Sequence, residues 1–113
     1  MADESDRYVY RIHWSNEDDG FVATVAELPD LRFIAQSSLD ALAGLRVLAS
    51  ERVAAMRSKG QNVPEPFEDR HYSGHIMVRV PPEVHRRLTI EAAEQGVSLN
   101  RLVQSRLTQS TKA

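Results

Sequence analysis

A run of alternating residues in the last third of the chain carries side chains that could recognise nucleic-acid bases. His75, Met77 and Arg79 are separated by single apolar residues, so an extended backbone would place all three on one face, about 7 Å apart. Arginine can donate two hydrogen bonds to guanine O6 and N7, histidine can donate or accept one, and methionine can contact a thymine methyl group. The alternation predicts a half-buried strand over residues 75–80. Its inner face is apolar: Ile76, Val78 and Val80.

Helix signals follow this stretch directly. Pro81 and Pro82 stop a strand, and Pro82 suits the first position of a helix. The pattern predicts a helix over residues 82–95, with Gly96 behind it in a left-handed conformation. A second helix is predicted from residue 99 to about residue 108, because apolar residues recur there at helical spacing.

The start of the second helix could bind a phosphate group. Ser98 is a strong N-cap, and the helix behind it begins at Leu99. The amide groups of Leu99 and Asn100 have no partner within a helix, and they lie at the positive end of its dipole. These amide groups could therefore hold the backbone of a nucleic acid.

One strand and two helices cannot bury three apolar faces alone, and a lone strand leaves both of its edges unpaired. A second copy would supply the missing strand, paired antiparallel across a two-fold axis. Two motifs stand in order here: Arg79-Val80-Pro81-Pro82-Glu83-Val84 and Gly96-Val97-Ser98-Leu99-Asn100. Together they resemble a ribbon-helix-helix DNA-binding domain, which dimerises and inserts its two-stranded ribbon into the major groove.

The resemblance implies a role for each candidate residue. The outward side chains, His75, Met77 and Arg79, would read bases, and the helix start at Ser98, Leu99 and Asn100 would hold a phosphate. The alternative is a plain dimerisation module, in which Arg79 is only a solvated charge.

Composition divides the chain into an acidic front and a basic back. Residues 1–69 hold 13 acidic and 7 basic side chains, whereas residues 70–113 hold 3 acidic and 7 basic ones. The net charges are therefore −6 and +4. A basic half suits nucleic acid, and an acidic half suits a basic protein or serves only solubility.

The front half predicts a small α+β layer. Alternation predicts strands over residues 8–14, 21–26 and 31–36, with Trp14 and the tyrosines in the core of the sheet. Ser38 is predicted to cap a long helix over residues 39–59. We expect a three-to-four-stranded antiparallel sheet covered by this helix, with residues 1–67 as one domain, 68–74 as a linker and 75–113 as the second domain.

Several front-half motifs occur in a recognisable order: Asp19-Gly20-Phe21, Glu27-Leu28-Pro29-Asp30, Ser38-Leu39-Asp40-Ala41, and the exit from Gly60 through Pro66. In this order, and with the ribbon-helix-helix pattern behind them, they resemble the N-terminal domain of HicB antitoxins. The resemblance implies a pared-down RNase H fold and a bacterial or archaeal toxin–antitoxin pair. Its partner would be a HicA-type toxin, a small basic protein that cleaves messenger RNA.

By this resemblance, the front domain would bind and inhibit the toxin, and the back domain would repress its own operon by binding operator DNA. The chain would act as a homodimer, and a second interface through the front domain allows a tetramer. Charge alone suggests acidic residues in predicted turns as toxin contacts, because opposite charges favour association. They are Glu17, Asp18, Asp19, Glu27 and Asp30.

Other functions remain as alternatives. The chain could be a stand-alone transcription regulator whose front domain binds a small ligand or oligomerises. A nuclease is disfavoured, because adjacent carboxylates on a hairpin tip rarely converge on one metal ion. The four histidines lack metal-ligand spacing and cysteine is absent, so we expect no catalytic residues, metal or cofactor. Short apolar runs and the lack of a signal pattern before Tyr8 favour a cytoplasmic protein without a membrane anchor.

Overall fold

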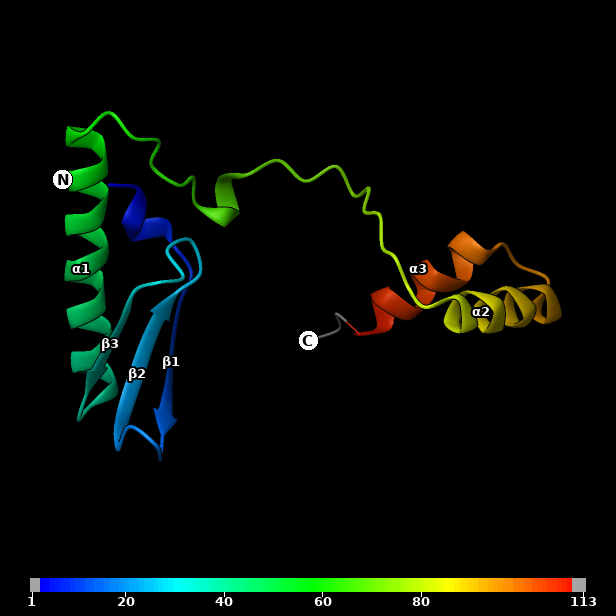
Figure 1. The fold of residues 1–113 in the computed structure, drawn as a ribbon, viewed down its shortest axis with the longest axis horizontal. Helices are drawn as coiled ribbons and strands as arrows, with labels where there is room; N and C mark the ends of the chain where they lie inside the picture. Colours follow the sequence, from blue (N-terminus) through cyan, green and yellow to red (C-terminus); the bar gives the residue numbers. More distant parts are fainter. Residues whose placement is uncertain (1–2, 111–113) are drawn as a thin grey trace. The chain divides into compact units, whose positions relative to one another are not determined.

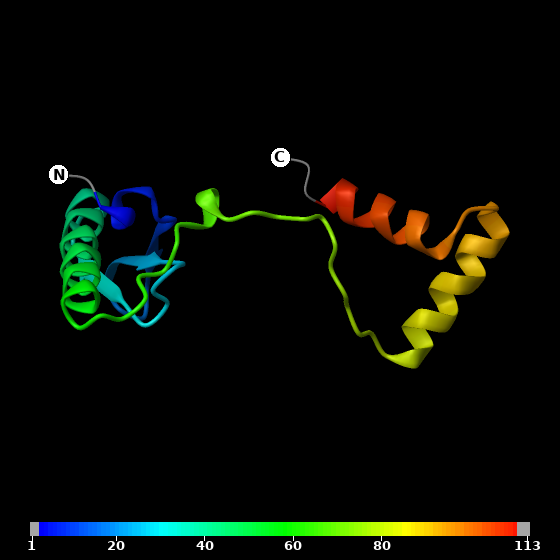
Figure 2. The same ribbon diagram turned by 90° about the horizontal axis from the view of Figure 1, so that it is seen from above.

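The computed structural model describes residues 3–110. The chain divides into two compact units, Met1–Ser73 and Gly74–Ala113. The first unit combines a sheet with a long helix, and the second contains shorter helices (Figure 1 and Figure 2).

The sheet of the first unit has three antiparallel strands in the order β1-β2-β3. They are β1 (Tyr10–Ser15), β2 (Gly20–Val25) and β3 (Arg32–Ala35). All three predicted strands are confirmed, with ends shifted by one or two residues. Ile12 lies opposite Ala23, and Ala23 lies opposite Phe33, so one face of the sheet is apolar across all three strands. Within residues 3–110 no fourth strand follows the long helix, so the sheet has three of the three to four strands that were expected.

The long helix α1 runs over Ser38–Ser58. Its N-cap is Ser37 and not Ser38 as predicted, because the Ser37 hydroxyl accepts the amide hydrogen bond of Asp40 at 3.0 Å. The two serines are adjacent, so the sequence pattern could not separate them. Gly60, at φ 71°, follows the last turn, where a left-handed residue ends many helices.

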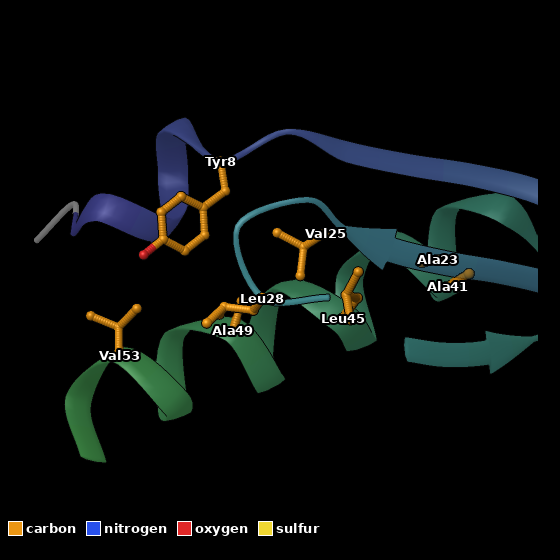
Figure 3. Packing of buried hydrophobic residues seen from close by; sticks show 8 residues of the cluster. All are labelled: Tyr8, Ala23, Val25, Leu28, Ala41, Leu45, Ala49 and Val53. Carbon is orange, nitrogen blue, oxygen red and sulfur yellow. The ribbon is translucent and has the colours of Figure 1, made fainter. Parts of the chain in front are cut away.

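The core of the first unit lies between the sheet and α1 (Figure 3). Leu45 of α1 and Val25 of β2 are both fully buried there. Gly44 allows α1 to approach β3 closely, because a Cβ atom at this position would overlap the ring of Phe33. The cluster draws on the segment before β1, β2, the loop behind it and α1, and its buried members are Tyr8, Ala23, Val25, Leu28, Ala41, Leu45, Ala49 and Val53.

The chain between α1 and residue 72, here called the exit segment (residues 61–72), packs onto the first unit. The Tyr8 hydroxyl donates to the Pro64 carbonyl at 2.6 Å, and burial raises the pKa of Tyr8 to about 12. Pro66 is fully buried. Arg7 forms an ion pair at 2.8 Å with Asp69, the last residue of the short helix η2 (Phe67–Asp69). Much of the expected linker, residues 68–74, is therefore attached to the first unit.

The buried side chain of Glu27 binds the exit segment to the rest of the first unit. It is only 6% exposed. Its Oε1 accepts the amide hydrogen bond of Val9 at 2.9 Å, and its Oε2 accepts that of Phe67 at 3.0 Å. Glu27 was expected among the toxin-contacting acids of the surface, but its carboxylate instead joins the chain before β1 to the start of η2.

The second unit contains α2 (Pro82–Gln95) and α3 (Leu99–Ser110). The local signals predicted from sequence are confirmed: Pro82 is the first residue of α2, Gly96 is left-handed at φ 71°, and the Ser98 hydroxyl accepts the Arg101 amide at 3.0 Å. Residues 75–80 differ from prediction, since they form no strand in the single chain. A strand needs a hydrogen-bonded neighbour, and the described part of this chain offers residues 75–80 none.

Replacing Glu27 by glutamine should destabilise the first unit by about 1–3 kcal/mol, because one backbone amide loses its acceptor and meets the glutamine NH2 group instead. Urea unfolding followed by Trp14 fluorescence would measure this, since Trp14 is the single tryptophan and lies in the first unit. Glu17→Gln is the matched control at an exposed site, with an expected change within about 0.5 kcal/mol. Equal midpoints for the two variants would contradict the structural role of Glu27.

Candidate nucleic-acid and partner interfaces

Residues 75–80 expose an apolar row that a folded protein normally buries. The exposed fractions are 74% for Ile76, 67% for Val78 and 43% for Val80. Met77 is 93% exposed, the largest fraction among these hydrophobic residues. Figure 2 shows the segment running from the end of α3 to the start of α2. Both of its faces are thus open to a partner in the single chain.

A groove separates this segment from α3. Its volume is about 660 Å³, and a second groove of about 570 Å³ continues it toward α2. Val78, Val103 and Leu107 line both grooves, while polar side chains such as Asn100 and Gln104 also line the first. The second groove is mostly aliphatic, and it suits apolar side chains from another chain better than a polar ligand.

The second unit has almost no core of its own. Among its described residues, only Ala92 and Leu102 are buried hydrophobics, while Ile90 and Leu107 are 44% and 47% exposed. A unit of about this size rarely folds alone without metals, disulfides or a partner. The chain has no cysteine, so no disulfide compensates for this small core.

The predicted phosphate-contacting residues lie at the start of α3. The Ser98 hydroxyl is used as the N-cap, while the amide groups of Leu99 and Asn100 lie in the first turn, where a helix supplies no acceptors. Asn100 lines the same groove as His75 and Met77. The structure therefore brings one of the three predicted phosphate-contacting residues, Asn100, close to part of the predicted base-reading face.

Positive charge is available on this unit. Arg86 pairs with Glu83 at 3.6 Å, and Arg106 pairs with Glu91 across the two helices. Arg79 is exposed, and no ion pair holds it among residues 3–110. Its guanidinium group is therefore available for an external acceptor.

The predicted toxin-contacting acids fall into separate places. Glu17, Asp18 and Asp19 lie together in the exposed turn between β1 and β2, where Asp18 bonds to Arg32 at 3.0 Å. Asp30 lies elsewhere and receives two hydrogen bonds from Arg52, at 3.2 and 2.8 Å, which lower the pKa of its carboxyl group. Glu27 is buried, so these five acids do not form one surface.

Trp14, near the end of β1, lies beside this turn. Trp14 was expected in the core of the sheet, but it is 46% exposed. Alternation along β1 correctly placed it on the apolar face. Alternation could not predict the exposure of Trp14, because it does not show that the end of the strand lies beside a turn that leaves this face uncovered.

Residues 3–110 contain neither a metal-binding cluster nor a membrane-spanning helix. No three His, Asp or Glu side chains gather there in a way that could hold a metal ion. None of the helices described has both the length and the apolar character needed to span a bilayer.

Residues 59–107 match the sequence model of the HicB family. The match begins at the end of α1 and continues through the exit segment, residues 75–80 and α2 into α3, and it covers less than half of the 113 residues. This part of the chain is similar to HicB proteins, and the Gly60–Pro66 motif lies within it. The other front-half motifs lie outside the match. No curated protein and no solved structure matches the chain.

Proposed function

We propose that the chain is a HicB-type antitoxin whose second unit forms a ribbon-helix-helix homodimer on operator DNA. The first unit binds and inhibits a HicA-type, mRNA-cleaving toxin. The carrying observation is the exposed alternating segment 75–80 beside two helices that bury only Ala92 and Leu102. Similarity of residues 59–107 to the HicB family supports the same reading.

Dimerisation would solve the burial problem of the second unit. If residues 75–80 of two copies pair antiparallel, each strand gains a hydrogen-bonding neighbour. Ile76, Val78 and Val80 would then face the helices of both copies. The opposite face of the ribbon would carry His75, Met77 and Arg79 from each copy, and a two-stranded ribbon of this kind fits the major groove.

The first unit has its own core and a negative net charge, so it can serve as an independent binding unit. Association with a basic, RNA-binding toxin is favoured by charge complementarity. Glu17, Asp18 and Asp19 form an exposed acidic turn suited to such a partner. Asp30 is held by Arg52, and Glu27 is buried, so neither is proposed as a direct contact.

Neighbouring substitutions should separate dimerisation from DNA binding. Val78→Asp should shift the protein to a monomer, because the proposed dimer buries this side chain, whereas Met77→Asp should preserve the dimer and abolish operator binding by repelling phosphate and bases. Sedimentation analysis would give the oligomeric state, and gel shifts on the DNA upstream of the coding sequence would give binding. A Val78→Asp variant that remains dimeric would rule out this ribbon.

Arg79→Ala should weaken specific operator binding by about 1–3 kcal/mol while the dimer persists, because a base contact is lost and the ribbon is retained. The comparison is the ratio of affinities for operator and random DNA at one salt concentration. Arg87→Ala, on the exposed side of α2, is the control for a loss of positive charge alone. An unchanged ratio for Arg79→Ala would remove it as a base-reading residue.

Toxin inhibition should belong to the first unit. A fragment of residues 1–73, which keeps the exit segment, should stop RNA cleavage by a HicA-type toxin and should not bind operator DNA. A fragment of residues 74–113 should not protect RNA from cleavage. A soluble, folded 1–73 fragment that fails to protect RNA, alongside full-length protein that also fails, would favour a stand-alone regulator.

A further inference from the structure

We propose that the β1–β2 turn end of the first unit is a docking surface for a basic protein, with Trp14 and Leu39 as its apolar anchors. The surface, here called the turn-end surface, consists of Trp14, Glu17, Asp19, Leu39 and Asp40. The inference rests on the proposed function, and it identifies where the toxin would bind.

Trp14 is exposed yet held in place. Its indole N–H donates to the Asn16 side-chain oxygen at 2.7 Å. Its ring meets Phe21 edge to face, with centroids 5.2 Å apart. A half-exposed tryptophan with a fixed orientation loses little conformational entropy when a partner covers it, and tryptophan is the residue type most enriched in binding hot spots.

Leu39 adds aliphatic surface at the same end of the unit. It is 75% exposed in the first turn of α1. The Gln36 side chain donates to the Asp19 carbonyl at 3.0 Å, which ties the chain entering α1 to the β1–β2 turn. Figure 1 shows the β1–β2 turn and the start of α1 at the same end of this unit.

The charge at this end is only partly neutralised internally. Five arginines of the unit are paired with carboxylates, and one of these pairs, Arg32–Asp18, holds a carboxylate of the β1–β2 turn itself; the other four are Arg7–Asp69, Arg46–Asp6, Arg52–Asp30 and Arg57–Glu4. Within the described chain, the carboxylates of Glu17, Asp19 and Asp40 join no such pair. Apolar anchors bordered by uncompensated negative charge fit a protein surface that has an apolar pocket inside a basic rim.

The occupant we assign is therefore a basic protein, and not a second copy of this chain. A second copy would bring its own Glu17, Asp19 and Asp40 against the same carboxylates, which is unfavourable. Nucleic acid is disfavoured for the same reason, since its phosphates are also negative.

The test uses the full-length protein and a HicA-type toxin, made inactive by substitution so that it can be titrated. Leu39→Ala and Glu17→Lys should each weaken binding about tenfold or more, and Trp14→Ala should weaken it further, as expected of a central aromatic anchor. Val47→Ala and Glu51→Lys are matched controls, because both residues are exposed on α1 outside the turn-end surface. They should bind within about twofold of the unmodified chain.

The outcomes separate the two proposals. If the unmodified chain binds and the turn-end variants match their controls, the turn-end surface is wrong while toxin binding stands. If the unmodified chain does not bind at all, the proposed function fails and this surface falls with it. Leu39 and Glu17 are exposed, so their variants report on binding even if Trp14→Ala perturbs the fold, which circular dichroism would reveal.

Discussion

The unpaired backbone of residues 75–80 is the constraint on which the second unit depends. A strand is stabilised by a neighbouring strand, and the described chain offers these residues none. The adjacent helices keep their apolar side chains half-exposed, as Leu107 does at 47%. Backbone pairing and apolar burial are missing on the same side of the unit, so one partner could supply both. A two-fold copy is the economical solution, because it presents the same unpaired strand and the same open groove.

The first unit, in contrast, has a buried core of its own. Its helix and sheet enclose a cluster in which Leu45 and Ala23 are fully buried, and the buried carboxylate of Glu27 closes the unit by accepting two backbone amides from distant parts of the chain. Such a carboxylate replaces the hydration that these amides lose. The unit therefore needs no partner to fold, and its exposed features are available for recognition.

Sequence reasoning succeeded where the signal was local and failed where it was not. Pro82, Gly96 and Ser98 act on their immediate neighbours, so the limits of α2 and the cap of α3 could be read directly. Glu27 appeared to be an ordinary turn acid, because nothing in its neighbourhood foretells that Phe67, forty residues later, donates to it. The strand at 75–80 was predicted from alternation, yet alternation describes a face to be buried, and a single chain lacks the pairing that would make it a strand. The base-reading roles of Met77 and Arg79 stay predictions.

Ion pairs in the first unit matter more for recognition than for stability. Pairs such as Arg46–Asp6 and Arg7–Asp69 are well exposed, and exposed pairs contribute little to folding. They do, however, determine which charges a partner meets. The pairs join α1 to η1 (Glu4–Arg7) and to the loop before β3, join β3 to the β1–β2 turn, and join η1 to η2. In the described chain Glu17 and Asp19 join no such pair, and Arg32 holds only their neighbour Asp18, so negative charge stays partly uncompensated beside a tryptophan that the sheet leaves uncovered. Charge would steer a basic partner to this end, and apolar contact would retain it.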